Sequence, residues 1–462
     1  MLANIKKIIK VLNKNEYSTK KEVIKPYCVD WRGDYKGTSS LIVHPSTVEK
    51  ISKIVKICNF TRTPIIPQGG NTGLVGGSVP RRNKGEIILN LRKLDKIRKI
   101  NLTDKTITVE SGCILENVKK ELSKFDMVFP LSLGSKGSCQ IGGNIATNAG
   151  GVNVIKYGSL RSNILGLEVV SSDGKVFSEL NDIKKNNTGL DLKQLFIGSE
   201  GILGIITAAT IRIFDKPQER IVLWVGIRNF KETLKLYEKI TAMFQDQITS
   251  FELMNKKSIS IIKQIEFDFK IANNKIFCLI EISNFQKIQD FSDFVINRLS
   301  VLDTEKMEII VSKSEYENQV IWNLRESIPV EERKIGSIIK HDVSIPLENM
   351  ENFIKTTELE IKQFDRMSEI INFGHLGDNN LHYNVVINNP QKIKSSSTPK
   401  IINNIIFNNV MKNKGSISAE HGIGQLRKKE LFEFKGKASI KAMKSIKKIF
   451  DPRNIFNPGK VI

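Results

Sequence analysis

Apolar and polar positions in the first half of the chain alternate in short runs. Residues 41–43 and 64–66 are apolar and of strand length. The residues between them, 47–59, repeat with helical periodicity, and Ser46 or Thr47 can cap that helix. Residues 1–30 resemble a short helical lead-in. Further strands are predicted at 86–91, 106–110, 164–171 and within 202–214, and a further helix at 114–125. This half of the chain is therefore predicted to be α+β.

The pattern changes after Asp215, Lys216 and Pro217. Glycine becomes scarce until Gly374, and apolar runs at 221–227, 276–282 and 307–311 alternate with helices rich in Lys and Glu. Such an order predicts a domain boundary near residue 216 and a second, antiparallel α+β domain. Glycine-rich loops return at 374–384 and 415–424, and the chain ends in a helix followed by a turn.

The composition is that of a globular protein. The 462 residues are 40% hydrophobic and 26% charged, and the length corresponds to about three domains or lobes. No apolar run approaches the ~18 residues that a membrane-spanning helix needs.

The charge is strongly basic: 71 Lys and Arg against 49 Asp and Glu give a net charge of +22. A nucleic-acid-binding protein would be expected to favour Arg for its bidentate contacts, but 55 of these residues are Lys and 16 are Arg. The interpretation is a solvated basic surface that attracts anionic substrates and membrane headgroups, with no nucleic-acid partner.

The cysteines and the N-terminus bear on location. Five widely spaced cysteines contain no C-x-x-C pair, which favours free, mostly buried thiols in a reducing compartment. The first residues are basic, but no apolar signal segment follows them. These observations predict a bacterial cytoplasmic protein, with peripheral contact to the inner membrane left open.

Three glycine-rich loops are flanked by predicted strands. They begin at Gln68, at Gly142 and at Gly198. Glycines permit close backbone approach, so consecutive N–H groups can surround a phosphate. The first loop is neither a Walker loop nor a Rossmann fingerprint. Three such loops in succession predict several surfaces that grip one long phosphorylated cofactor.

Together, these loops resemble the flavin-binding domain of the vanillyl-alcohol oxidase/p-cresol methylhydroxylase (PCMH) superfamily. From Asp30 onward the chain is similar to the D-lactate/D-2-hydroxyglutarate dehydrogenase and glycolate oxidase flavin-subunit group. The resemblance implies an α+β fold: a PCMH-type FAD-binding domain of two α+β subdomains, an antiparallel α+β substrate (cap) domain and a C-terminal helical segment. The implied bounds are 1–33 for the lead-in, 34–216 for the FAD domain, 217–430 for the cap and 431–462 for a segment that returns to the flavin.

The resemblance also implies the residues that bind FAD. Asn71 stands where some relatives carry a His that bonds covalently to the flavin, so non-covalent FAD is expected. The implied contacts are Gln68, Gly69, Gly70, Asn71, Thr72, Gly73, Gly142, Gly143, Asn144, Thr147, Asn148, Glu200, Gly201, Ile205 and Asn457.

Histidine is scarce, yet three of the five lie in the two C-terminal glycine loops. His375 and His382 flank one tight loop, and Glu420 precedes His421 in the other. Two His and one Glu are a workable ligand set for Zn²⁺ or another divalent ion. The spacing alone leaves a metal site and structural histidines equally open.

The resemblance implies specific roles for this cluster. His375, His382 and Glu420 become metal ligands, with zinc the expected ion, and His421 becomes the general base. Asn384, Arg325 and Lys340 are implied to bind the substrate. The D-2-hydroxyglutarate enzymes commonly have Thr where this chain has Pro329, which leaves recognition of a distal carboxylate open. His44 and His341 are interpreted as structural.

The implied activity is oxidation of a D-2-hydroxy acid, D-2-hydroxyglutarate or D-lactate, by hydride transfer to flavin N5 with metal-assisted deprotonation by His421. The alternative is a flavin subunit of a glycolate oxidase-like complex, active only with partner subunits. An electron-transfer flavoprotein, a quinone or a cytochrome is expected to accept the electrons, and a homodimer is a family-based expectation.

Overall fold

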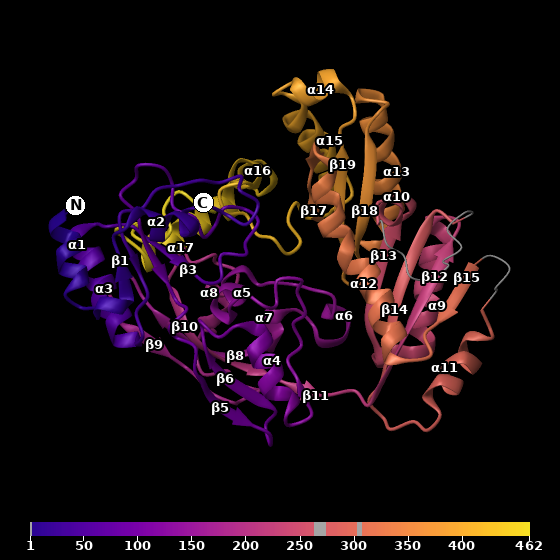
Figure 1. Ribbon diagram of the computed structural model, residues 1–462, viewed down its shortest axis with the longest axis horizontal. Coiled ribbons are helices and arrows are strands. Elements are labelled where there is room, and N and C mark those ends of the chain that lie inside the picture. Colours follow the sequence, from indigo (N-terminus) through magenta and orange to yellow (C-terminus); the bar gives the residue numbers. More distant parts are fainter. Residues whose placement is uncertain (1, 263–273, 303–306) are drawn as a thin grey trace. The chain divides into compact units, whose positions relative to one another are not determined.

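The computed structural model describes residues 2–262, 274–302 and 307–462 (Figure 1). The chain divides into two compact units. Unit 1 comprises residues 1–150, 159–215 and 420–462, and unit 2 comprises 151–158 and 216–419. The chain passes between the units at 150/151, 158/159, 215/216 and 419/420, and the sequence predicts boundaries at 216/217 and 430/431.

Unit 1 contains a four-stranded sheet in the order β1-β2-β4-β3, in which β4 runs parallel to both β2 and β3. Helix α3 (Val48–Thr61) supplies Ile51, Ile54, Val55 and Cys58 to the adjoining core, at the spacing of one helical face. The side chain of Thr47 accepts a hydrogen bond from the Lys50 N–H, so the predicted cap is confirmed. The remaining elements of this part are α1 (Leu2–Ile9), β1 (Tyr17–Ser18), α2 (Lys21–Ile24), β2 (Ile42–Val43), β3 (Ile65–Gln68) and β4 (Ile87–Asn90).

A five-stranded antiparallel sheet, ordered β5-β6-β10-β8-β9, forms the second part of unit 1. Unit 1 thus has the two predicted α+β subdomains. The strands are β5 (Ile97–Asn101), β6 (Thr106–Glu110), β8 (Ile164–Val170), β9 (Val176–Ser178) and β10 (Ile205–Arg212), and a two-stranded sheet joins β7 (Met127–Val128) to β11 (Phe214–Asp215). The helices are α4 (Leu115–Ser123), α5 (Ile141–Thr147), α7 (Leu160–Asn163) and α8 (Lys193–Phe196).

The C-terminal segment completes unit 1, and in Figure 1 it lies among the N-terminal elements. Helices α16 (Lys428–Phe434) and α17 (Lys437–Phe450) are followed by a stretch that returns to the four-stranded sheet, where Phe456 forms a parallel bridge with Ile65. Ile455 and Phe456 are buried in the same core as β2 and β3. The tail is therefore an integral part of this unit.

Unit 2 is built on an antiparallel sheet ordered β15-β12-β14-β13-β18-β19-β16, with β17 also paired to β19. This confirms the antiparallel α+β prediction. The strands are β12 (Glu219–Ile227), β13 (Ile248–Asn255), β14 (Ile276–Asn284), β15 (Met307–Val311), β16 (Ile338–Ile339), β17 (Asp342–Ser344), β18 (Glu369–His375) and β19 (Asn380–Val386). The helices are α6 (Val154–Tyr157), α9 (Phe230–Phe244), α10 (Lys256–Ser260), α11 (Phe291–Leu299), α12 (Glu315–Glu331), α13 (Leu347–Phe364), α14 (Pro390–Lys394) and α15 (Thr398–Lys412).

All five cysteines are free and buried, as predicted. No helix in the described ranges is both long and apolar enough to cross a bilayer.

Candidate functional site

The first glycine loop of unit 1 is held by its own polar side chains. The Gln68 Nε2 donates to the carbonyl oxygens of Tyr27 and Ser78, at 2.9 Å each. Asn71 adopts a φ of +56° and donates to the Val29 carbonyl at 2.8 Å. Gly70 is required because a Cβ there would lie 2.0 Å from the Ser138 carbonyl oxygen. Thr72 and Gly73 continue the same loop.

The second loop begins within α5 and faces the first. A Cβ added at Gly69 would lie 3.7 Å from the Gly143 Cα. A Cβ added at Gly143 or at Gly73 would meet no described atom within 4 Å, so open space adjoins both glycines. Gly142 instead packs against Ser111. The other predicted contacts in this loop hold protein atoms: Asn144 reaches Cys139 Sγ at 3.6 Å, Thr147 donates to the Gly143 carbonyl at 3.1 Å, and Asn148 accepts from the Arg161 N–H at 3.0 Å.

The third loop reaches the segment that follows His421. Glu200 is buried, and its carboxylate accepts hydrogen bonds from the N–H groups of Ile423 at 2.7 Å and Gly424 at 2.8 Å. Burial raises the pKa of this carboxyl to about 7. The Glu200 side chain thus holds the loop next to His421. Gly201 follows with a φ of +71°, and Ile205 begins β10.

The C-terminal tail connects the first loop to the third through hydrogen bonds. The Asn457 Nδ2 donates to the carbonyl oxygens of Gly77 at 2.9 Å and Glu200 at 2.8 Å. Lys460, 1% exposed, donates through Nζ to Gly77 at 3.0 Å and Val79 at 2.6 Å. Burial lowers the pKa of the Lys460 ammonium group to about 7. Sequence analysis selected Asn457 from this tail but missed Lys460, although both belong to the same Asn-Pro-Gly-Lys turn.

Two observations indicate that these loops can bind FAD. Open space adjoins Gly73 and Gly143, where a side chain would otherwise stand. Two buried acceptors, Gln140 Oε1 and Asn457 Oδ1, receive no hydrogen bond within the described residues. Buried acceptors normally have a donor, and FAD offers several in its ribityl hydroxyls, its ring N–H and its adenine amino group.

Replacing Lys460 with Met is expected to change how stability depends on pH. The folded pKa of about 7 lies below the ordinary value of 10.5. Between these pH values only the unfolded chain carries the proton, so wild-type stability rises with pH. The difference in unfolding free energy, wild type minus variant, should therefore grow by up to about 1.4 kcal/mol per pH unit above pH 7.

Urea unfolding of the cofactor-free protein at pH 7.5 and 9.5 measures this difference. The control is Lys448→Met, at an exposed position on α17. A difference for Lys460→Met that stays flat, or that falls with pH, would show that Lys460 remains protonated in the folded state.

Unit 2 contributes a buried chain of charged groups. His375 Nδ1 lies 2.7 Å from Glu252 Oε1, and the Arg325 Nε donates to Glu252 Oε2 at 2.8 Å. All three residues are buried, and the Arg325 guanidinium lies over the Phe373 ring at 4.7 Å. Arg325, predicted to bind the substrate carboxylate, therefore binds a protein carboxylate. Because the Glu252 carboxylate contacts Nδ1 of His375, it fixes the orientation of the ring. The other ring nitrogen, Nε2, can then bind a metal ion or another group.

The other predicted substrate groups also hold a buried glutamate. Lys340 Nζ forms an ion pair with Glu332, and the Asn384 Nδ2 donates to the same carboxylate at 2.8 Å. The Asn384 Oδ1 accepts from the His341 N–H at 3.1 Å. Both ring nitrogens of His341 contact protein oxygens, which agrees with its structural interpretation.

One group of potential metal ligands occurs in the described residues. Asp342, His382, Glu420 and His421 each offer one ligand atom, and these atoms lie within 4.8 Å of one another. Asp342 is the register partner of His382, with 3.7 Å between Asp342 Oδ1 and His382 Nδ1. The Ala419 N–H donates to the Asp342 carbonyl, so Glu420 directly follows a residue held beside that strand.

This group differs from the predicted ligand set. It contains two of the three predicted ligands, His382 and Glu420, together with His421, which was predicted as the base, and Asp342, which was not predicted. His375 lies outside the group, although its ring centroid is 5.5 Å from that of His382.

The chain matches two families. Residues 39–178 match the FAD binding domain, and residues 216–461 match the C-terminal domain of FAD linked oxidases. The chain is 34% identical over 455 residues to the mitochondrial D-2-hydroxyglutarate dehydrogenase of Danio rerio, covering 96% of this chain and 82% of the relative. It is 35% identical over 446 residues to a Schizosaccharomyces pombe protein named for mitochondrial D-lactate dehydrogenase activity, covering 94% of this chain and 84% of the relative.

Solved structures show the same fold. P-cresol methylhydroxylase superimposes with a TM-score of 0.78 at 16% identity, covering 100% of this chain and 96% of that one. Alkyldihydroxyacetonephosphate synthase gives a TM-score of 0.76 at 17% identity, covering 99% and 84%. The predicted PCMH-type fold is confirmed.

The predicted location is wrong. The bacterial cytoplasmic assignment rested on the reducing-compartment cysteines and the absence of a signal segment. It is contradicted by the relatives, which are eukaryotic proteins whose names place several of them in the mitochondrion. A reducing environment suits free thiols in more than one compartment, so the cysteines could not distinguish them.

Proposed function

The chain belongs to the FAD-linked oxidase family and is a D-2-hydroxy-acid dehydrogenase, and from this premise we propose that it oxidises D-2-hydroxyglutarate or D-lactate to the 2-oxo acid with His421 as the base. The observation that carries the proposal is the group formed by Asp342, His382, Glu420 and His421. Two imidazoles and two carboxylates within 4.8 Å can hold a cation and move a proton.

Two bound groups would complete the proposed chemistry. The glycine loops of unit 1 would hold FAD, which would supply the acceptor for the hydride that leaves C2 of the substrate. A divalent ion, proposed to be Zn²⁺ and to be held by His382 and Glu420 with His375 or Asp342, would lower the pKa of the substrate hydroxyl.

The residues of the chain supply position and proton transfer. His421 Nε2 lies 3.8 Å from Glu420 Oε1, so the proposed acceptor of the hydroxyl proton stands beside a proposed metal ligand. Glu200 fixes the backbone of Ile423 and Gly424, immediately after this His. Glu252 orients the His375 ring. The flavin loops and the proton acceptor are therefore held by one hydrogen-bonded frame in unit 1.

Three residues bear on which D-2-hydroxy acid the protein oxidises. Pro329, inside α12, lacks the N–H and hydroxyl that a Thr would provide, and Arg325 and Lys340 are engaged with Glu252 and Glu332. The proposed electron acceptor is an electron-transfer flavoprotein, a quinone or a cytochrome.

The first test combines cofactor, metal and substrate. Purified protein should show a flavin spectrum that bleaches anaerobically when D-2-hydroxyglutarate or D-lactate is added. Prior treatment with a chelator should slow bleaching at least tenfold, and Zn²⁺ should restore it. The L-enantiomers serve as controls.

Two outcomes would contradict the proposal. A yellow protein that no D-2-hydroxy acid bleaches would favour the flavin subunit of a larger complex. Bleaching at an unchanged rate after metal removal would reject the metal-assisted mechanism.

A further inference from the structure

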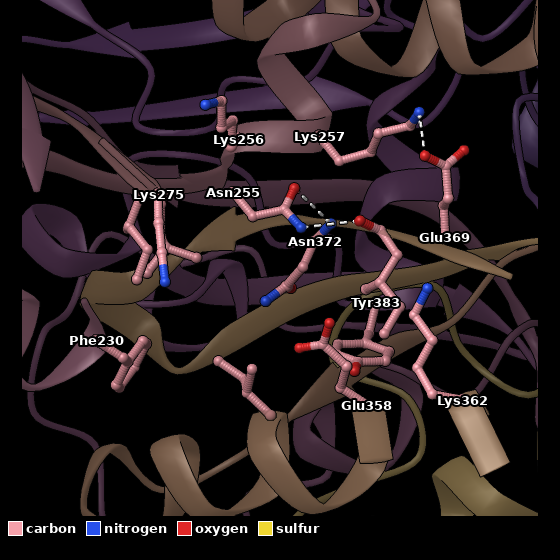
Figure 2. Close-up of a pocket in the computed structure, with 14 residues that line it drawn as sticks. Phe230, Asn255, Lys256, Lys257, Lys275, Glu358, Lys362, Glu369, Asn372 and Tyr383 are labelled. Carbon is pink, nitrogen blue, oxygen red and sulfur yellow. Dashed lines mark hydrogen bonds and ion pairs between the residues drawn. The ribbon is translucent and has the colours of Figure 1, made fainter. Parts of the chain in front are cut away.

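Unit 2 contains a cavity on the face of the sheet opposite His375 and His382. Side chains alternate between the two faces of a strand. On β19, His382 and Asn384 therefore point to one face and Tyr383 to the other, while on β18 Asn372 points away from Phe373 and His375. Asn372 and Tyr383 line a cavity of about 370 Å³ (Figure 2). The sheet of unit 2 thus lies between this cavity and the side chains of His375 and His382.

Two buried polar atoms in this cavity lack a hydrogen-bond partner among residues 2–262, 274–302 and 307–462. Asn372 and Tyr383 are register partners on adjacent strands, and their exposed fractions are 3% and 0%. Neither Asn372 Oδ1 nor the Tyr383 hydroxyl makes a hydrogen bond within the described residues. Such groups are rare in native proteins because their lost hydration is not replaced. Two such groups at paired positions of neighbouring strands indicate that a bound molecule supplies their hydrogen bonds.

The two groups have complementary needs. Burial raises the pKa of the Tyr383 hydroxyl well above its ordinary value, so the hydroxyl stays protonated and requires an acceptor. The Asn372 Oδ1 requires a donor. A single ligand that satisfied both groups would need both an acceptor and a donor.

The charge around the cavity selects an anion. Four lysines and two glutamates line it: Lys256, Lys257, Lys275, Lys362, Glu358 and Glu369. Lys257 pairs with Glu369 at 2.6 Å, and this contact lowers the pKa of the Glu369 carboxyl. The lining therefore carries two more positive than negative charges, with Lys275 exposed at one side.

We propose that this cavity binds a small carboxylic acid that also carries a hydroxyl or amino group. The carboxylate accepts from the Tyr383 hydroxyl and lies among the lysines, while the hydroxyl or ammonium group donates to Asn372 Oδ1. At ~30 Å³ per water molecule in the liquid, the volume has room for roughly a dozen non-hydrogen atoms, which accommodates a metabolite of this class.

The test uses 3-hydroxypropanoate as the probe, because its hydroxyl is not on C2 and it is not a 2-hydroxy acid. Isothermal titration of the FAD-loaded protein should show saturable binding, and propanoate, which lacks the donor, should bind about fivefold more weakly. Tyr383→Phe and Asn372→Leu should each weaken binding of 3-hydroxypropanoate about fivefold or more. Tyr316→Phe, at an exposed position outside the cavity, is the matched control.

Folding of the variants can be checked independently. Tyr383→Phe removes an unsatisfied hydroxyl without removing a hydrogen bond to the protein, so its melting temperature should be no lower than that of the wild type. Equal binding of the two probes, or unchanged binding in both cavity variants, would overturn the proposal. A crystal soaked in 3-hydroxypropanoate that shows only water beside Tyr383 and Asn372 would also overturn it.

Discussion

Replacing His421 with Gln is expected to slow reduction of bound flavin by a D-2-hydroxy acid about a thousandfold. A positioned general base contributes roughly 10²–10⁴ to the rate, and Gln cannot accept the hydroxyl proton. The side chain of His421 is partly exposed, and Glu200 holds the following backbone through Ile423 and Gly424. The variant should therefore fold and retain FAD. Stopped-flow absorbance under anaerobic conditions measures the rate.

A second variant separates proton transfer from a structural role. His421→Ala with added imidazole should recover part of the lost rate, because free imidazole can act as the base in the space that the side chain leaves. The flavin spectrum and melting temperature should match those of the wild type in both variants. A rate within tenfold of wild type for His421→Gln would assign the base to another residue.

Replacing Glu252 with Gln is expected to lower the free energy of unfolding by about 3–5 kcal/mol, because it leaves the buried Arg325 without its counter-charge. Glu252 also orients His375, and loss of such a partner typically costs 10–100-fold in metal affinity. Urea unfolding and zinc titration measure the two effects. Glu351→Gln, which removes one member of the surface pair with Lys355, should change stability by less than about 0.5 kcal/mol.

The pH dependence of this effect follows from the same contacts. Burial alone would raise the pKa of Glu252, but His375 and Arg325 hold it below its ordinary value of 4.5. A lowered folded pKa means that the stabilisation is complete above pH 4.5 and is lost as the pH falls below it. Wild type and Glu252→Gln should therefore converge in stability toward low pH. Parallel curves would indicate that the charge of Glu252 is not what stabilises the cluster.

Local patterns predicted the fold well where neighbouring residues determine structure. The strand predicted at 106–110 is β6 (Thr106–Glu110), and the predicted cap Thr47 begins α3. The first glycine loop also follows its predicted strand, β3 (Ile65–Gln68). Periodicity and capping act over a few residues, so the sequence reports them directly.

The partners of the site residues could not be predicted, because they depend on strand register. Asp342 faces His382 from 40 positions earlier in the chain, and Glu252 faces His375 from 123 positions earlier. A Glu inside the apolar run of β13 was the one local signal of a buried charge. The partners of Arg325 and Lys340 could not be predicted either. A cation that binds substrate and a cation that neutralises a buried carboxylate have the same appearance in a sequence.

The order of the two units along the chain has a consequence for synthesis on the ribosome. Unit 1 gains its last core residues, Ile455 and Phe456, and the lysine that clamps Gly77 only after all of unit 2 has been translated. At 5–20 residues per second, translation of unit 2 delays completion of unit 1 by roughly 10–40 s. During that interval the nascent flavin loops lack their clamp and are exposed to chaperones and proteases. A chain that ended before Glu420 would therefore lack Ile455, Phe456 and Lys460, and the core around its four-stranded sheet would be incomplete.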